Sequence, residues 1–244
     1  MCHSDESRPP APPRHGELGL CGDLTLTAVD GNVLDAYEAH PAERSALGIV
    51  ILPDNRGLHE YYKQLARYFA QAGLHAVAID YYARTAGRGD RSEAFDYATH
   101  WKQATTEGVD ADVAAAAAHI RETGVSTLFT IGFCFGGGHS WRQSAVLPGT
   151  AGSIGLYGFA QGVLAVQERI AAPLLMLLGG ADQMIDPASF DPLIASLALR
   201  GIAADRHVYD GAPHSFFDRT FADHGPECSD AWQRILAFTD ANSK

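Results

Sequence analysis

The sequence has no long apolar segment. None of its apolar runs approaches the roughly 20 residues that a membrane-spanning helix needs. Residues 1–13 are polar and Pro-rich, and they lack the apolar stretch of a secretory signal peptide. We therefore expect no membrane partner and a cytoplasmic location.

The chain is also poor in positive charge. It has 18 Lys and Arg against 29 Asp and Glu, which gives a net charge of −11 with His neutral. Nucleic acids and anionic membrane surfaces attract proteins of the opposite sign, so neither is an expected partner. A small anionic substrate remains possible, because it needs only a local pair of arginines.

Cysteine is scarce and scattered. The four cysteines are Cys2, Cys21, Cys134 and Cys228, and none of them forms Cys-x-x-Cys or zinc-ligand spacing. This distribution suits reduced thiols in a cytoplasm better than a disulfide framework. The eleven histidines include no His-x-x-x-His on a convincing helix, and there is no dinucleotide-binding or Walker motif. We expect no metal and no cofactor.

What the chain does contain is an alternation of short apolar runs and segments of helical period, with 46% apolar residues overall. The expected strands are 48–52, 75–79, 128–131, 152–156, 172–178 and 203–209. The expected helices are 60–72, 93–106, 109–123, 139–146, 191–199 and 230–240. Segments 18–26 and 32–40 flank Asp30-Gly31, a hairpin signal, and residues 81–90 read as a loop. The pattern predicts one α/β domain with a mostly parallel, doubly wound sheet and an antiparallel N-terminal hairpin, preceded by a flexible arm over residues 1–16.

The most informative motif is Gly132-Phe-Cys134-Phe-Gly136, which follows an apolar strand and precedes a helix. This is the nucleophile-elbow pattern, Gly-x-nucleophile-x-Gly, with cysteine in place of serine. The nucleophile needs a sharp turn with positive φ, and the two glycines let the arms of the turn pass close together. The helix N-terminus behind Cys134 would stabilise a thiolate or an oxyanion.

The order of chemical groups along the chain supports this reading. Asp182 and His214 each follow a later strand, which reproduces the nucleophile–acid–histidine order of α/β-hydrolases. His214 would accept the thiol proton, and Asp182 would hold its tautomer. The oxyanion would be bound by the backbone N–H of Phe135 and by a second donor from an early loop, most simply Asn55.

Other readings stay open at this point. A cysteine beside a buried strand is often only a small core residue. Asp182 could be a turn or cap acid, with Asp186 and Asp191 as rivals, and His214 could be a surface histidine. The turn could also serve a non-catalytic protein.

Three segments together carry a family resemblance: residues 132–137 (Gly-Phe-Cys-Phe-Gly-Gly), 179–182 (Gly-Gly-Ala-Asp) and 212–216 (Ala-Pro-His-Ser-Phe). They resemble the dienelactone hydrolase (carboxymethylenebutenolidase) family of the α/β-hydrolase superfamily, over about residues 18–238. The resemblance implies an α/β-hydrolase domain over 17–244 and a Cys134–His214–Asp182 triad without metal or cofactor.

The resemblance extends to three further positions. The family's glutamate that contacts the thiol corresponds to Asp54, which is one methylene shorter and could instead cap the loop. Its substrate-binding arginines correspond to Arg84, in Asp-Tyr-Tyr-Ala-Arg, and more loosely to Arg219. Such a pair would bind a substrate carboxylate.

The predicted function is a cysteine-dependent hydrolase of lactone or activated ester bonds that forms a thioester intermediate. Its partner would be a small ester or lactone, with or without a carboxylate. The alternative is a non-catalytic small-molecule-binding or redox-sensing protein on the same scaffold, in which Cys134 is an oxidisable thiol.

Overall fold

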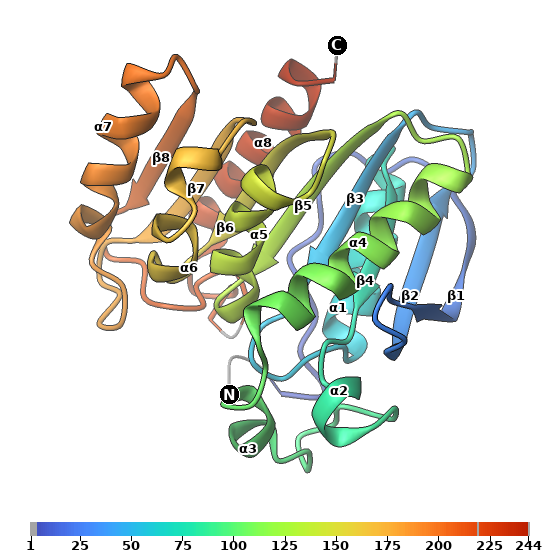
Figure 1. Ribbon diagram of the computed structural model, residues 1–244. Helices are drawn as coiled ribbons and strands as arrows, with labels where there is room; N and C mark the ends of the chain where they lie inside the picture. Colours follow the sequence, from blue (N-terminus) through green and yellow to red (C-terminus); the bar gives the residue numbers. More distant parts are fainter. Residues whose placement is uncertain (1–3, 219, 244) are drawn as a thin grey trace.

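The computed structural model describes residues 4–218 and 220–243, which form a sheet covered by helices on both faces (Figure 1). The eight strands lie in the order β1-β2-β4-β3-β5-β6-β7-β8. They are β1 (Leu18–Thr27), β2 (Val33–Pro41), β3 (Leu47–Leu52), β4 (His75–Ile79), β5 (Thr127–Phe133), β6 (Thr150–Leu156), β7 (Leu174–Gly179) and β8 (Ala204–Tyr209).

The sheet is parallel from β4 to β8, and β1 and β2 add an antiparallel hairpin at one edge. This confirms the predicted fold class. The central strands are buried on both sides, as expected for runs such as the β7 sequence Leu-Leu-Met-Leu-Leu-Gly. Asp30-Gly31 forms the expected turn, with Gly31 at φ 86°.

Two helical layers enclose the sheet. One core packs α1 (Glu60–Gln71) and α8 (Gly225–Ala241) on one face, and two further cores pack α4 (Thr106–Glu122), α5 (Phe135–Val146) and α7 (Asp191–Leu199) on the other. Short elements complete the chain: α2 (Ala83–Ala86), α3 (Tyr97–Trp101), α6 (Gln161–Leu164), η1 (Gln167–Arg169) and η2 (Pro187–Phe190). No helix of the described residues is long and apolar enough to cross a bilayer.

The expected helix over 93–106 is wrong. Only α3 forms inside it, because the segment contains two helix starts rather than one. Asp96 caps α3 by accepting from the Thr99 N–H, and Thr105 adopts extended backbone and caps α4 through Gly108. The segment 81–90, expected to be only a loop, contains the single turn α2.

The N-terminal segment from residue 4 to residue 16 lies along the domain. The Pro10 carbonyl accepts a hydrogen bond from Trp232 Nε1 at 2.9 Å, and the Gly16 N–H donates to Gln71 O at 2.7 Å. Asp5 forms an ion pair with the buried Arg56. The arm expected over residues 1–16 therefore has specific contacts in its described part, a feature that its polar, Pro-rich composition did not indicate.

Candidate active site

Cys134 stands at a strained turn between β5 and α5. It has φ 51°, and it is 4% exposed. A Cβ added at Gly132 would lie 1.9 Å from the Gly136 carbonyl oxygen. The strand and the helix therefore approach so closely that only glycine fits, as the motif predicted. Cys134 is also the N-cap of α5, so its side chain lies at the positive end of the helix dipole.

The turn holds Cys134 against the end of β6. The Cys134 N–H donates to Leu156 O at 3.0 Å, and the next residue of that strand end is Tyr157. The Tyr157 ring centroid lies 5.1 Å from that of His214. Cys134 and Tyr157 belong to one buried cluster that includes Phe216, two residues after the histidine. The fold thus brings the cysteine and the histidine to the same region.

His214 and Asp182 form a hydrogen-bonded pair. His214 Nδ1 lies 2.8 Å from Asp182 Oδ2. The side chain of Asp182 is fully buried, and its other oxygen, Oδ1, accepts from the N–H groups of Met184 and Ile185 at 2.8 and 3.1 Å. Asp182 is therefore fixed at both oxygens, and it can orient the imidazole and stabilise its protonated form. The rival Asp186 instead caps η2.

Backbone strain gathers around these groups. The described non-glycine residues with positive φ are Cys134 at 51°, Tyr157 at 38° and Ser215 at 62°. Ser215 directly follows His214, and the Tyr157 hydroxyl donates to the buried Asp218 at 2.9 Å. Such strain costs about 1–3 kcal/mol per residue and persists where the surroundings impose it, typically at functional sites. Sequence patterns did not indicate the strain at Tyr157 or Ser215.

The two elements expected to bind an oxyanion are adjacent. A Cβ added at Gly136 would lie 2.2 Å from Leu52 O and 2.3 Å from Pro53 O, so the first turn of α5 packs on the loop after β3. Phe135 begins α5, and the Asn55 carbonyl accepts from the Tyr82 hydroxyl at 2.7 Å. The first turn of α5, which begins at Phe135, thus lies against the start of the loop that contains Asn55.

Asp54 is fully buried in the same loop. Its Oδ1 accepts from the Arg56 N–H at 2.9 Å, which is the loop-capping contact expected of a short acidic residue. Asp54 and Cys134 both lie near Tyr81. The pKa of Tyr81 is raised well above its usual range, mainly because the side chain is buried. The charges of Tyr82, Asp54 and Cys134 raise it further. Asp54 therefore holds the loop, and its expected contact with the Cys134 thiol stays a prediction.

Arg84 does not lie free in this site. Its Nη2 lies 2.8 Å from Asp112 Oδ1 and its Nε 3.1 Å from Asp112 Oδ2, and its Nη1 pairs with Asp30 at 2.5 Å. Two carboxylates thus occupy the guanidinium that was expected to bind substrate. These contacts of Arg84 are therefore structural, and its expected role in binding a substrate carboxylate stays a prediction. Arg219 lies outside the described residues.

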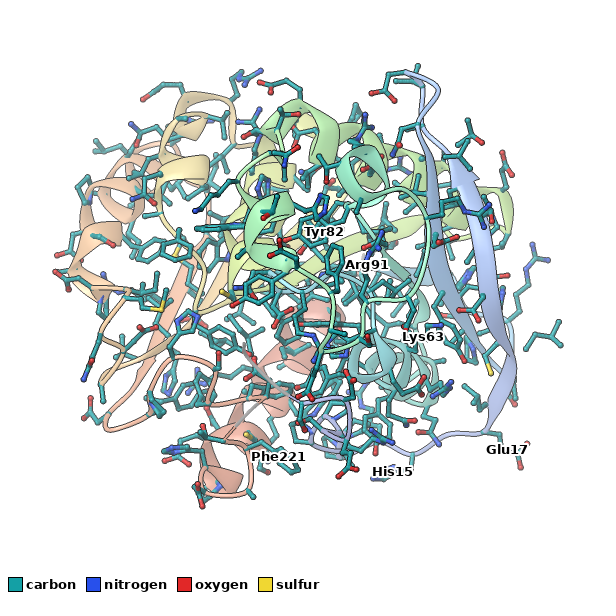
Figure 2. The ribbon with its side chains drawn as sticks, turned by 90° about the horizontal axis from the view of Figure 1, so that it is seen from below. His15, Glu17, Lys63, Tyr82, Arg91 and Phe221 are labelled. Atoms are coloured by element: carbon teal, nitrogen blue, oxygen red, sulfur yellow. The ribbon has the colours of Figure 1, made fainter. Side chains whose placement is uncertain are left out.

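The sequence reasoning missed two buried arginines near the site. Arg91 pairs with the buried Asp80 at 2.8 Å, and its guanidinium lies over the Phe95 ring. Figure 2 views the molecule from the side where α2 and α3 lie and shows Arg91 beside Tyr82. Arg56 Nη2 donates to Arg91 O at 2.9 Å. A signal was available, because Asp80 directly follows a buried strand and such a carboxylate needs a cation.

The region over Phe135 is covered by aromatic side chains. The ring centroids of Tyr81 and Trp101 lie 5.2 and 6.4 Å from that of Phe135. Trp101 belongs to α3, which lies with α2 beyond the carboxyl ends of the strands (Figure 1). In open α/β sheets this edge is where ligands bind. Aromatic rings therefore lie against Phe135, the residue that directly follows Cys134.

A family model described as the dienelactone hydrolase family matches residues 34–242. The chain belongs to the dienelactone hydrolase family. A Methylorubrum extorquens protein named "Putative carboxymethylenebutenolidase" is 30% identical over 238 residues, covering 88% of this chain and 79% of that protein. The carboxymethylenebutenolidase of Rhodococcus opacus is 25% identical over 250 residues, covering 98% and 96% of the two chains.

The solved structures agree with this assignment. A crystal structure of a "Putative Dienelactone Hydrolase" from Klebsiella pneumoniae subsp. pneumoniae superimposes with a TM-score of 0.75 and 27% identity, covering 90% of this chain and 98% of that one. Membership in the dienelactone hydrolase family confirms the α/β-hydrolase fold and the expected enzyme class, a hydrolase of carboxylic ester or lactone bonds.

Proposed function

We propose that this dienelactone hydrolase family member cleaves lactones or activated esters through a thioester on Cys134. The observation that supports this proposal most directly is the strained turn at Cys134 together with the hydrogen-bonded pair of His214 and Asp182. Cys134 has positive φ at the N-terminus of α5, and His214 is hydrogen-bonded to a doubly held Asp182. A protein that only bound ligands or sensed oxidants would need no acid to fix a histidine tautomer.

In the first half-reaction, His214 takes the thiol proton and the Cys134 sulfur attacks the carbonyl carbon. The tetrahedral oxyanion is stabilised by the Phe135 N–H and by a donor from the loop of Asn55, with the α5 dipole behind them. The C–O bond then breaks, and the His214 imidazolium gives its proton to the departing oxygen. In a lactone this step opens the ring, and the acyl group stays on sulfur.

In the second half-reaction, His214 takes a proton from water, and the hydroxide attacks the thioester carbonyl. The C–S bond breaks, the product leaves as a carboxylic acid, and the thiol recovers its proton. A thiolate is a better leaving group than an amine or a simple alkoxide. We therefore expect activated esters and enol lactones as substrates rather than amides.

A reducing cytoplasm, as expected from the scattered cysteines, would keep this thiol reduced. In the described part of the chain Cys21, Cys134 and Cys228 are free thiols. Burial raises the pKa of Cys228 to about 12, so that thiol is unreactive near neutral pH. Cys21 is exposed and competes in any labelling experiment, and Cys2, which lies outside the described residues, is a further thiol that must be removed.

The test is intact-mass labelling with iodoacetamide, run beside hydrolysis of an aryl ester and a dienelactone. The double variant Cys2→Ser and Cys21→Ser removes the two competing thiols and should keep full activity. In that background one adduct at Cys134 should remove activity in step with labelling, and Cys134→Ala should abolish turnover. Full turnover by Cys134→Ala would contradict the proposal. If iodoacetamide labels Cys134 but the unlabelled protein hydrolyses neither substrate, the result would favour the redox-sensing alternative.

A further inference from the structure

A second group of chemically active side chains lies far from Cys134 along the strands. Glu38 and His40 come from β2, His75 is the first residue of β4, and His119 comes from α4. Cys134, in contrast, follows the last residue of β5. Because β4 and β5 run in the same direction, the two groups lie at opposite ends of the parallel sheet. Nothing in the hydrolase reaction uses this cluster.

The three imidazoles converge on one carboxylate oxygen. The distances from Glu38 Oε2 to Nε2 are 2.8 Å for His119, 3.3 Å for His40 and 3.5 Å for His75. The rings of His40 and His75 are stacked, with centroids 3.9 Å apart. The donor atoms of Glu38, His40 and His75 all lie within 4.8 Å of one another. Strand alternation explains why Glu38 and His40 are neighbours, since residues two apart in β2 point to the same face of the sheet.

The tautomer of His75 is fixed by its other nitrogen. His75 Nδ1 lies 3.0 Å from Thr123 Oγ1, and that hydroxyl already donates to Ile120 O at 2.7 Å. His75 Nδ1 is therefore the donor, and in the neutral imidazole, the form that binds a metal, Nε2 carries a lone pair.

Two acceptors then face each other, the buried His75 Nε2 and an oxygen of the partly exposed Glu38. The His75 Nε2 lone pair points toward a carboxylate oxygen 3.5 Å away, and Nε2 has no hydrogen-bond partner among the described residues. His75 is only 3% exposed. A buried acceptor without a donor costs about 1–3 kcal/mol. A cation between the two atoms would remove that cost.

The spacing fits a metal ion. Zinc takes nitrogen and oxygen ligands at about 2.0–2.1 Å, so two ligand atoms of a tetrahedral site lie about 3.3–3.4 Å apart. The Glu38–His40 and Glu38–His75 distances of 3.3 and 3.5 Å match this edge. The Thr123 hydroxyl on His75 and the His119 imidazole on Glu38 supply the outer hydrogen bonds that orient metal ligands.

We propose that Glu38, His40 and His75 bind one Zn²⁺ ion, with His119 positioning the carboxylate. Glu38 and His40 are each between a quarter and a third exposed, so an ion enters from solvent while His75 anchors it from inside. The fourth position is open to water. The ion links β2 to β4, the two strands where the antiparallel hairpin joins the parallel sheet. Its role is to stabilise this edge, separately from catalysis.

The test measures Zn²⁺ binding by calorimetry and the melting temperature at rising Zn²⁺, with Mg²⁺ as the comparison ion. The wild type should bind one equivalent at this site and melt about 5–10 °C higher at a hundredfold excess over Kd, and Mg²⁺ should have no effect. His40→Gln, which alters a partly exposed side chain, and His75→Gln should each weaken binding at least tenfold. The matched control is His207→Gln, because Nε2 of His207 faces only one carboxylate, at 3.7 Å.

Cys134, His214 and Asp182 are also residue types that bind zinc. Binding there must therefore be distinguished from binding at Glu38, His40 and His75. X-ray absorption at the zinc edge of the Cys134→Ala variant should show nitrogen and oxygen neighbours at about 2.0–2.1 Å and no sulfur at about 2.3 Å. Binding lost in Cys134→Ala but retained in both His40→Gln and His75→Gln would overturn the proposal. Failure of the wild type to bind at millimolar Zn²⁺ would do the same.

Discussion

Asp182 holds His214 through one carboxylate oxygen at 2.8 Å, while two backbone N–H groups hold the other oxygen. The acid is therefore anchored by the turn after β7 and not by the histidine it orients. Replacing its charge should disturb the imidazole and leave the turn largely intact.

Asp182→Asn should lower kcat/KM for an activated ester by about 10²–10⁴-fold with a small change in melting temperature, because the amide cannot stabilise the imidazolium. Steady-state kinetics and a thermal melt measure both effects. Asp186→Asn is the matched control, since Asp186 only caps η2, and it should retain activity. Equal losses of kcat/KM in the two variants would contradict the proposed role of Asp182 in orienting His214.

Gly132→Ala should destabilise or misfold the protein, because the added methyl would lie 1.9 Å from the Gly136 carbonyl oxygen. The clashing oxygen belongs to the backbone of α5, so α5 would have to move to relieve the clash. We expect this movement to cost about 1–3 kcal/mol or more. Gly22→Ala in β1 is the control, with no atom within 4 Å of the new methyl. Urea denaturation compares the two, and a Gly132→Ala protein as stable and active as the control would contradict this account of the turn.

Arg84→Met should lower stability and leave substrate selectivity unchanged. It would remove the cation beside Asp112, whose side chain is fully buried, and breaking a buried pair costs up to about 3–5 kcal/mol. Arg88→Met should change stability by less than about 1 kcal/mol, because the Arg88 side chain is 51% exposed in its pair with Asp35. We would compare urea midpoints, and kcat/KM for a carboxylate-bearing and a neutral ester. A loss confined to the carboxylate-bearing ester would support the substrate-binding role.

His139→Gln should flatten the loss of stability in acid. Burial lowers the pKa of His139 to about 4, although Asp110 acts in the opposite direction, while the unfolded value stays near 6.5. Above pH 6.5 the His139 ring is neutral in both the folded and the unfolded protein. Between pH 6.5 and 4 the unfolded state binds the proton first, so stability falls by at most about 1.4 kcal/mol per pH unit from this group. Urea midpoints at pH 7.5, 6 and 5 should show a shallower slope in the variant, and equal slopes would exclude His139 as a cause.

Local sequence patterns predict the main features of this fold. The apolar runs, the Asp-Gly turn and the glycines around Cys134 predicted the sheet, the hairpin and the sharp turn, because each depends on neighbours within a few residues. The order of Cys134, Asp182 and His214 could also be read directly. Local capping was harder to read, since Asp96 and Thr105 divide one apparent helix into a short turn and a new start.

Which charged groups meet depends on how the folded chain brings remote segments together. Arg84 has the family's spacing, yet the fold brings Asp112 and Asp30, from other elements, to its guanidinium. The convergence of Glu38, His40 and His75 was invisible because β2 and β4 are neighbours in the sheet but not in the chain. Ion pairs and ligand sets depend on distances between remote segments, and a single sequence records those distances only where a local pattern accompanies them.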